Sequence, residues 1–385
     1  MVNYGKHKVS KEDVKAVLEV LNSDFLTTGP KVPEFEKCLK NYCGASYCTV
    51  VCNATAALHL VMLAYEISQG DIVWTTPISF AATANAAMYV GAKVRFVDIN
   101  IETFNLSARK LEEKLLNIKP NNYPKAIVFV HLAGNPSETA EIHKICKKYK
   151  IIFIEDASHS LGSMVGEQKT GACEFSDATV FSFHPVKMIT TAEGGAVLTN
   201  SKKIDDRIKL LRSHGISRNH SNESFKDKPW YYEQTELGFN YRMSDLQAAI
   251  GVSQLSRLDS FVLQRRKLAK EYSARLKKTN VKLQKVEDGH QSSYHLFVVK
   301  FPKNETRDQV YNHLLSLQIK CNLHYIPIYR FPFYVKNYGN QTHRFPNAEQ
   351  YFSTALTLPL FVDLPLQIVE TVCEVIHECS KGSHK

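Results

Sequence analysis

The chain contains no long apolar run and no low-complexity segment, and each of these absences excludes a class of protein. No apolar stretch approaches the ~18 residues that a membrane-spanning helix requires. The first residues also lack the apolar core of a secretory signal peptide. Together with a composition that is 44% hydrophobic, these absences predict a globular cytoplasmic protein that does not interact with membranes.

Paired cysteine motifs are also absent. The nine cysteines are an odd number, and none is spaced as Cys-x-x-Cys. Disulfide frameworks and zinc sites use paired cysteines, so we expect neither of them here, and no metal. No Gly-x-Ser-x-Gly elbow precedes His159 or His184, which disfavours a Ser/His hydrolase.

Acidic residues are fewer than basic ones, which gives the chain a formal net charge of +10. A charge of this size admits a nucleic-acid-binding or regulatory protein as an alternative to an enzyme. The basic residues are nevertheless scattered through helical patterns such as 207–212 and 265–267, with acidic residues nearby. Solvated helix faces, or a site for an anionic diphosphate, explain the charge without nucleic acid.

Strand-like apolar segments alternate with amphipathic helical patterns through the first half of the chain. Such alternation predicts an α/β fold with a mainly parallel, seven-stranded sheet that helices cover on both faces. Two strands that follow each other directly, 178–183 and 195–199, allow a local antiparallel pair. The other predicted strands are 47–51, 71–75, 93–97, 125–130 and 151–154, and helical patterns lie near 54–67, 107–117 and 138–149.

The length of 385 residues exceeds the ~150 that are typical of one domain, so we expect two domains. The large domain is predicted at 1–250, and a smaller α/β C-terminal domain at 251–385. A long periodic stretch from about Ser244 to Lys278 leads from the first to the second. The smaller domain is expected to contain a strand at 293–299 and helices near 305–318 and 366–378.

One lysine stands between two apolar strands. Lys187 follows the strand that ends at Phe183 and precedes a Gly194-Gly195 turn into the next strand, where its amine can be held away from bulk water. Desolvation lowers the pKa of a lysine, and a neutral amine can condense with a carbonyl group to form a Schiff base. An ordinary surface lysine that lays its stem on apolar residues is the alternative.

A carboxylate ends a neighbouring buried strand. The run 151–154 has no polar alternation, which is typical of a buried parallel strand, and it leads to Glu155 and Asp156. Ligands of open α/β sheets bind at the carboxyl ends of the strands. Asp156 can there hold the pyridine nitrogen of pyridoxal phosphate protonated, which makes the ring an electron sink. A helix N-cap is the alternative for Asp156 alone, and only the pair with Lys187 favours the cofactor.

A third element can bind the phosphate of such a cofactor. Small residues from Asn53 to Ala57 follow a strand and open an amphipathic helix. A dianion can therefore reach the free N–H groups of that helix and the positive end of its dipole. Thr55 adds a hydroxyl group, and Ser182 can donate another hydrogen bond. Small residues also open helices for packing reasons alone, so this interpretation depends on Asp156 and Lys187.

Ordered segments along nearly the whole chain resemble the DegT/DnrJ/EryC1/StrS family of nucleotide-sugar aminotransferases. The resemblance implies an aminotransferase with the fold of aspartate aminotransferase, which is fold type I of the enzymes that use pyridoxal phosphate. The segments that carry it include Leu26–Pro30, Ala54–Leu58, Thr76–Asn85, Phe96–Ile99, Arg212–Gly215, Gly238–Asp245 and His324–Pro327, besides Asp156 and Lys187.

The resemblance also implies roles for individual residues. Lys187 becomes the Schiff-base lysine and proton shuttle, and Asp156 the partner of the pyridine nitrogen. Phe80 takes the position of the aromatic residue that stacks on the cofactor ring. Asn240 takes the position that reaches the cofactor phosphate of the neighbouring subunit, which implies a homodimer with shared sites. The implied cofactor-binding residues are Thr55, Ala56, Phe80, Asp156, His159, Ser182, Lys187 and Asn240, and the substrate-binding residues are Thr28, His324 and Tyr325.

The chain departs from the commonest family pattern at His159, where most members have glutamine, and at Asn53-Ala54, where Ser-Gly is usual. Within the family, segments 157–162, 184–195 and 212–216 are similar to the branch that makes precursors of pseudaminic acid. This similarity implies amino transfer from L-glutamate to C4 of UDP-2-acetamido-2,6-dideoxy-β-L-arabino-hex-4-ulose. A 4-aminotransferase of the viosamine or perosamine type is the alternative. Lys187 argues against the dehydratases of the family, which carry histidine at that position.

Overall fold

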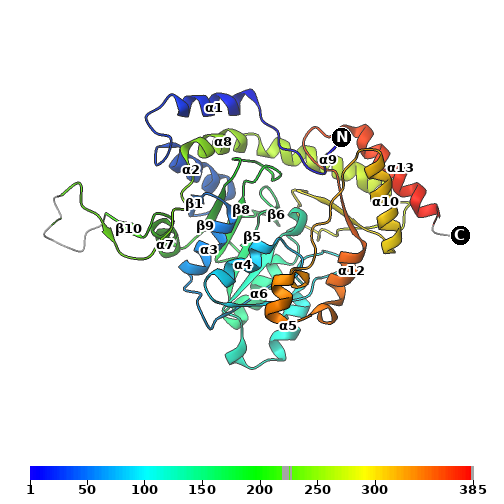
Figure 1. The fold of residues 1–385 in the computed structure, drawn as a ribbon, viewed down its shortest axis with the longest axis horizontal. Coiled ribbons are helices and arrows are strands. Elements are labelled where there is room, and N and C mark those ends of the chain that lie inside the picture. The colour runs from blue at the N-terminus through cyan, green and yellow to red at the C-terminus, as the bar shows by residue number, and fades with distance from the viewer. Residues whose placement is uncertain (219–224, 226–227, 383–385) are drawn as a thin grey trace.

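A seven-stranded sheet forms the centre of the computed structural model, which describes residues 1–218, 225 and 228–382 (Figure 1). The strand order is β3-β2-β4-β5-β8-β9-β1, and the neighbours from β3 to β8 are parallel. β9 runs antiparallel to both β8 and β1. The bounds are β1 (Tyr47–Val51), β2 (Ile72–Thr75), β3 (Lys93–Phe96), β4 (Ala126–Val130), β5 (Ile152–Asp156), β8 (Ala178–Ser182) and β9 (Gly195–Thr199).

Helices cover both faces of this sheet, because side chains along a strand alternate between the two faces. Val128 and Ile154 point into the core that they share with α3, α4 and α7. Their neighbours Ile127 and Phe153 point the other way, into a core with α5 and α6, and Phe181 packs with α2, α8 and α9. The helices are α2 (Lys31–Cys43), α3 (Ala54–Ala64), α4 (Ala81–Tyr89), α5 (Ala108–Leu116), α6 (Thr139–Tyr149) and α7 (Lys202–Arg212).

The long periodic stretch predicted from Ser244 to Lys278 consists of two helices. α8 (Asp245–Leu255) begins with a capping box in which Ser244 and Gln247 bond each other's backbone N–H groups. α9 (Leu258–Leu276) follows after a break of two residues, and α1 (Lys11–Leu21) packs along α8 (Figure 1). A break of only two residues is too short to be seen in the spacing of apolar residues, so the sequence indicates one stretch.

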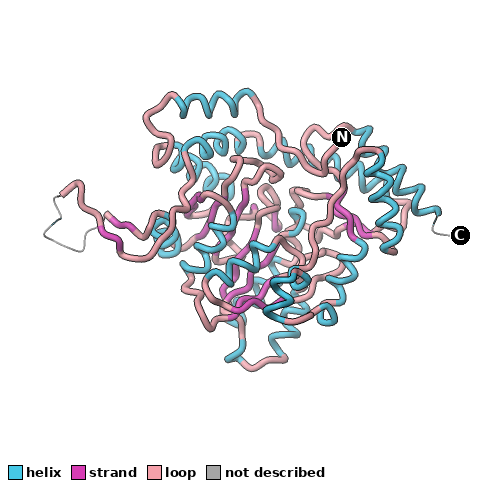
Figure 2. The backbone as a smooth tube through the Cα atoms, viewed as in Figure 1, coloured by secondary structure: helices cyan, strands magenta, loops and turns pink. Residues whose placement is uncertain are grey.

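A smaller antiparallel sheet, β12-β13-β14, lies beside the C-terminal helices (Figure 2). Its core is shared with α9, α10 and α13. The segment that contains α11 and α12 instead contributes Tyr334, Ala348 and Tyr351 to the core of the large sheet. The division into domains at residue 250 stays a prediction. The bounds are β12 (Lys282–Leu283), β13 (Phe297–Lys300), β14 (Ala355–Leu358), α10 (Asn304–Ser316), α11 (Pro332–Tyr338), α12 (Pro346–Thr354) and α13 (Leu366–Gly382).

Short elements complete the fold. The hairpin of β10 (Ile216–Ser217) and β11 (Glu233–Gln234) projects from the body of the molecule (Figure 1). Within the described part of the chain, no helix combines the length and the apolar character needed to cross a bilayer, and no cluster of three potential metal ligands occurs. The remaining elements are β6 (Met164–Val165), β7 (Gln168–Lys169) and the 3-10 helices Pro120–Asn122, Leu132–Gly134 (η2), Ile328–Arg330 and Thr342–Arg344.

Candidate active site

A cavity of about 1000 Å³ opens at the carboxyl ends of the central parallel strands. The first turns of α3 and α4, the ends of β5 and β8, and the segment 322–326 line it. This is the edge of the sheet at which α/β proteins bind their ligands. Nine of the eleven residues that the sequence singled out line the cavity: Thr55, Ala56, Phe80, Asp156, His159, Ser182, Lys187, His324 and Tyr325.

The other two residues, Thr28 and Asn240, lie outside the cavity lining and are exposed. Thr28 lies near the start of α8, because Thr27 forms a bridge with Ser244, and Asn240 lies beside the end of α7, because it forms a bridge with Ser213. A single subunit therefore does not bring Thr28 or Asn240 to Lys187. Their roles in binding stay predictions.

Lys187 lies in the cavity with its amine free of any hydrogen bond to the described residues. Its backbone N–H donates to the carbonyl of His184 at 2.9 Å, which closes a turn directly after β8. Burial lowers the pKa of Lys187 to about 8, although the carboxylate of Asp156 acts in the opposite direction. A lysine with this pKa is partly neutral at physiological pH and can act as a nucleophile.

The Gly194-Gly195 pair lets the loop after Lys187 return close to the N-terminus of α3. A Cβ atom on Gly195 would lie 2.7 Å from the backbone nitrogen of Ala54, and one on Gly194 would lie 2.1 Å from the hydroxyl of Thr191. Real Cβ atoms do not approach other atoms so closely. Glycine at both positions therefore brings the first turn of α3 against β9, beside Lys187.

Asp156 ends β5, and two hydroxyl groups fix its carboxylate. Thr83 donates to Oδ2 at 2.7 Å, and Ser158 donates to Oδ1 at 2.6 Å. The hydroxyl of Thr83 is itself held by Ser79 at 2.7 Å. A carboxylate can accept about four hydrogen bonds, so Asp156 retains acceptor capacity toward the cavity. It can thus bind a protonated ring nitrogen in a defined orientation.

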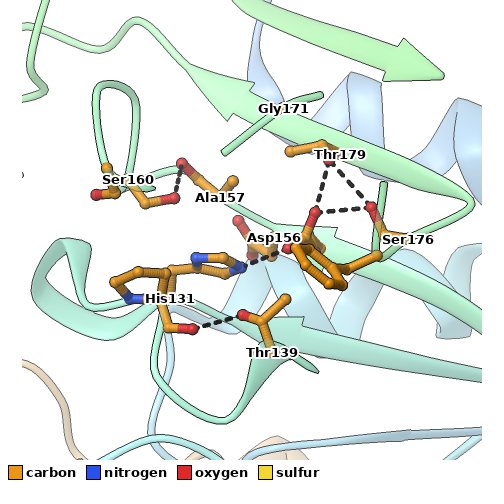
Figure 3. Close-up of polar contacts among 12 residues, drawn as sticks. His131, Thr139, Asp156, Ala157, Ser160, Gly171, Ser176 and Thr179 are labelled. Carbon is orange, nitrogen blue, oxygen red and sulfur yellow. Dashed lines mark hydrogen bonds and ion pairs between the residues drawn. The ribbon is translucent and has the colours of Figure 1, made fainter. Parts of the chain in front are cut away.

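Glu155 precedes Asp156 in β5, so its side chain lies on the other face of the sheet, in a network with His131, Ser176 and Thr179 whose contacts Figure 3 shows. Its carboxylate accepts hydrogen bonds from Ser176 at 2.7 Å and Thr179 at 2.8 Å, and lies 3.1 Å from Nε2 of His131. Burial alone would raise the pKa of Glu155, but these partners outweigh it and lower the pKa. Of the two adjacent acids, only Asp156 reaches the cavity.

The first turn of α3 offers backbone donors to an anion. The amides of Ala54 and Thr55 have no partner among the described residues, whereas the amide of Ala56 donates to the side chain of Asn53 at 2.8 Å. In this structure the side chain of the N-cap residue Asn53 occupies the amide of Ala56, and the role of Ala56 in binding the cofactor stays a prediction. Ser182 faces the same cavity from the end of β8.

Histidine and aromatic rings form one wall of the cavity. His324 bonds Thr357 at 2.9 Å, and burial together with the charge of Lys187 lowers the pKa of His324 to about 3. Phe80 leaves 64% of its side chain exposed and lies with its ring centroid 6.3 Å from that of Tyr325. This large exposed surface can cover a planar ligand.

The sequence patterns missed several residues of the cavity. His295 is buried with its ring centroid 4.5 Å from that of His159, and His59 lies 3.2 Å from the hydroxyl of Tyr241. All three of these newly found residues line the cavity. Their partners are distant in the chain, so no local motif reveals them. Only the alternation of strand residues 293–299 offered a signal for His295.

These residues fit pyridoxal phosphate. The cavity combines an unpaired lysine of lowered pKa, a fixed carboxylate, free amides at a helix N-terminus and an exposed aromatic ring. An amine, an acceptor for a pyridine N–H, an anion site and a stacking surface are the four features that this cofactor requires of a protein.

The chain matches known proteins over nearly its full length. Residues 7–377 match the model of the DegT/DnrJ/EryC1/StrS aminotransferase family. A UDP-4-amino-4,6-dideoxy-N-acetyl-beta-L-altrosamine transaminase of Campylobacter jejuni is 38% identical over 389 aligned residues, which cover 99% of each chain.

Solved structures of aminotransferases superpose closely on the fold. Helicobacter pylori PseC, an aminotransferase involved in the biosynthesis of pseudoaminic acid, gives a TM-score of 0.90 at 32% identity, over 98% of this chain and 99% of that one. The PLP form of a proposed sugar aminotransferase from Streptococcus pneumoniae gives a TM-score of 0.90 at 26% identity, over 99% of each chain. The likeness to these structures confirms the predicted α/β fold class.

Proposed function

The chain belongs to the DegT/DnrJ/EryC1/StrS aminotransferase family, and from this membership we propose a specific transamination. The protein transfers the amino group of L-glutamate to C4 of UDP-2-acetamido-2,6-dideoxy-β-L-arabino-hex-4-ulose, with pyridoxal phosphate as cofactor. The product is UDP-4-amino-4,6-dideoxy-N-acetyl-β-L-altrosamine, a precursor of pseudaminic acid. The observation that carries the proposal is Lys187 in one cavity with Asp156, in a chain 38% identical to a transaminase of that name.

Family membership decides against the nucleic-acid-binding alternative that the net charge of +10 admits. The basic residues also do not gather in the cavity. Lys187 is the single lysine or arginine among the described residues that line it. Most of the positive charge of the chain therefore lies on solvated surfaces and not in the cavity.

The residues of the cavity divide the work of transamination. When bound, pyridoxal phosphate supplies an electron sink and carries the amino group between the two substrates. The neutral amine of Lys187 would hold the cofactor by condensing with its aldehyde carbon, with release of water. Once the amino group of the substrate has displaced it, Nζ of Lys187 would accept and return a proton. Asp156 holds a proton on the ring nitrogen. The amides of Ala54 and Thr55 bind the phosphate, and Phe80 excludes water from one face of the ring.

The charge balance of the cavity supports a shared site. The substrates carry a diphosphate and two carboxylates, yet Lys187 is the one cationic side chain that the described residues place in the lining. Additional positive charge must therefore come from outside this subunit's cavity. Large apolar side chains are exposed in the cavity lining, at Phe80 and Tyr89, and elsewhere on the described surface, at Phe25, Leu26 and Leu237. A second copy of the chain, which would cover these residues and bring Asn240 to the site, satisfies both observations.

Subunit mixing tests this arrangement. We expect Lys187→Ala and Asn240→Ala homodimers each to be impaired, and their heterodimer to contain one site in which both native residues meet. Random exchange at equal amounts would then restore roughly a quarter of wild-type turnover, because half of the dimers carry one intact site of two. The measurement is turnover before and after exchange, with exchange verified by mass spectrometry of differently tagged subunits.

Two outcomes of this mixing experiment have clear meanings. Rescue in the heterodimer supports the proposal that Asn240 of one subunit contributes to the active site of the other. Verified exchange without rescue, when both parents are impaired, places Asn240 in its own subunit's chemistry or in folding alone. Two copies of Lys187→Ala that bear different tags serve as the control for the exchange procedure.

Substrate choice is expected to follow the sugar ring. The proposed UDP-linked L-arabino ketosugar should give a kcat/KM about 10²-fold larger than dTDP-4-keto-6-deoxyglucose, because displacement of the reacting carbon by on the order of 1 Å has that cost. The UDP-linked D-xylo epimer, which differs at C5, is the matched control for the nucleotide. Product analysis by mass spectrometry after incubation with glutamate measures the three rates. Equal or faster reaction of the dTDP sugar would favour the viosamine- or perosamine-type alternative.

A further inference from the structure

His159 is held by a backbone amide that a strained loop presents to it. The N–H of Ala133 donates to Nδ1 of His159 at 3.3 Å. Ala133 lies in η2 with a left-handed φ of 62°, and the next residue, Gly134, has a φ of 90°. A Cβ on Gly134 would lie 2.8 Å from the carbonyl oxygen of His159 and 2.4 Å from Oγ of Ser293. The loop therefore packs directly against His159, with its amide directed at the ring.

This contact determines which ring nitrogen carries the proton. A nitrogen that accepts a hydrogen bond from an N–H group cannot itself be protonated. Burial and the nearby charge of Lys187 lower the pKa of His159 far below its usual range, so the ring is neutral. A neutral imidazole carries one proton. That proton is consequently on Nε2, which lies 3.1 Å from Oη of Tyr325.

The hydroxyl proton of Tyr325 must then point elsewhere. Oη of Tyr325 accepts from Nε2–H of His159, and no other protein partner of this hydroxyl occurs among the described residues. Burial raises the pKa of Tyr325, so the hydroxyl keeps its proton. Tyr325 lines the cavity beside Phe80, with the two ring centroids 6.3 Å apart. The free proton thus faces the space that a ligand fills.

We propose that Tyr325 is an oriented hydrogen-bond donor to a ligand oxygen in the cavity, and that His159 is the positioning residue that fixes this direction. The chain of donors runs from the Ala133 amide to His159, from His159 to Tyr325, and from Tyr325 to the ligand. The acceptor is an anionic or carbonyl oxygen, such as the ring phenolate of the cofactor or the ketone of the sugar. The identity of this ligand rests on the proposed function, whereas the direction of the chain does not.

The protonation of His159 can be measured without cofactor or substrate. In ¹⁵N-imidazole NMR of the apoprotein near neutral pH, the His159 ring should be neutral with its proton on Nε2. The His159→Gln variant identifies its signals by their loss. A neutral ring with its proton on Nδ1 would overturn the proposal, since the hydroxyl of Tyr325 would then have to donate to His159. A doubly protonated ring would also overturn it, because Nδ1 could then not accept from the Ala133 amide, which is the contact that fixes the direction.

Four variants test the consequence for the ligand. Tyr325→Phe should weaken cofactor affinity or kcat/KM by about 10–100-fold, the usual effect of losing one hydrogen bond to a charged or reacting oxygen. His159→Leu should behave in the same way. His159→Gln should retain most function, because its amide oxygen can accept from Ala133 while its nitrogen donates to Tyr325. Tyr329→Phe is the matched control, since Tyr329 is buried outside the cavity and donates to Glu349 at 2.7 Å.

The readouts distinguish the source of the oxygen. A changed dissociation constant and absorption maximum of bound pyridoxal phosphate in Tyr325→Phe identify the cofactor oxygen. An unchanged cofactor affinity with a fall in kcat/KM for the ketosugar identifies the substrate. A Tyr325→Phe protein that matches Tyr329→Phe in both respects would overturn the proposal. A wild-type protein that binds no cofactor would instead reject the proposed function and leave the NMR result standing.

Discussion

Replacing Lys187 with alanine is expected to abolish the absorption band of the Schiff base between the lysine and pyridoxal phosphate and to reduce turnover by about 10⁴-fold or more. The variant loses both the nucleophile and the base, since one amine serves in both roles. Proton transfer by a positioned group alone contributes about 10²–10⁴-fold, and loss of covalent attachment adds to it. The measurements are the absorption spectrum after dialysis against cofactor and the rate of amine formation from glutamate and ketosugar.

The matched control for this variant is Lys148→Ala. Lys148 is an exposed lysine that pairs with Glu112 at 2.7 Å, far from the strand ends that form the cavity, so its loss should leave both readouts unchanged. Wild-type turnover in Lys187→Ala would show that another group is the nucleophile. If the wild-type protein is colourless after incubation with pyridoxal phosphate, the proposal that it binds this cofactor is wrong.

The rate at which the apoprotein captures pyridoxal phosphate gives a second readout of Lys187. Its pKa is lowered to about 8 by burial, and the neutral amine is the nucleophile. Capture should therefore accelerate as pH rises and level off above about 8. An ordinary lysine would continue to accelerate toward its pKa of about 10.4. Continued acceleration would show that the amine is more solvated than its place in the cavity indicates.

Most strand positions could be predicted from the sequence because the strands of the large sheet, except the edge strand β3, are largely buried on both faces. Their residues are mainly apolar and turn residues bound them, so β1 (Tyr47–Val51) and β9 (Gly195–Thr199) have the predicted limits. α4 (Ala81–Tyr89) was not among the predicted helices. It is rich in alanine and is buried at Thr83, Ala84 and Ala87, so it lacks the contrast between a polar and an apolar face.

The sequence predicts only those site residues that lie at strand ends or in local motifs. Asp156 and Lys187 follow strands of the sheet, and its topology brings them to one edge. The contact of Ala133 with His159 could not be inferred, because it depends on a left-handed loop conformation that alanine rarely adopts. The occupied amide of Ala56 was also hidden, since Asn53 can point either to the helix or to a ligand. The direction of a side chain at a helix start depends on tertiary contacts, which a local sequence pattern does not show.

The same contacts give a physical reason why histidine can stand at position 159 in place of glutamine. The family resemblance implies glutamine at this position, and an amide presents one acceptor and one donor side by side. A neutral imidazole with its proton on Nε2 presents the same pair, with Nδ1 toward Ala133 and Nε2 toward Tyr325. The substitution therefore changes the residue while preserving the order of hydrogen bonds.

Asp156→Asn is expected to reduce turnover by about 10²–10³-fold while the protein still folds. The variant leaves the protonated ring nitrogen of the cofactor buried without its carboxylate partner, which costs on the order of 3–5 kcal/mol. Asparagine keeps the shape of the side chain, and its amide oxygen can still accept from Thr83 or Ser158. It cannot supply the negative charge that holds a proton on the pyridine nitrogen. The electron sink is then weaker at every step in which a proton leaves carbon.

Glu193→Gln is the control that separates the position of Asp156 from its charge. Glu193 also lines the cavity, but it is exposed, and its hydrogen bonds to the described residues are made only through its backbone carbonyl. Its substitution removes one negative charge from the same cavity and should leave turnover within a few-fold of wild type. Steady-state rates and the thermal midpoint of each variant complete the comparison.

If Asp156→Asn keeps wild-type rates at an unchanged midpoint, the carboxylate serves only to fix Thr83 and Ser158, and another group must protonate the ring. If it loses activity together with a large fall in the midpoint, only the rate per folded, cofactor-loaded site can assign the loss to chemistry, and that rate should still be reduced about 10²-fold.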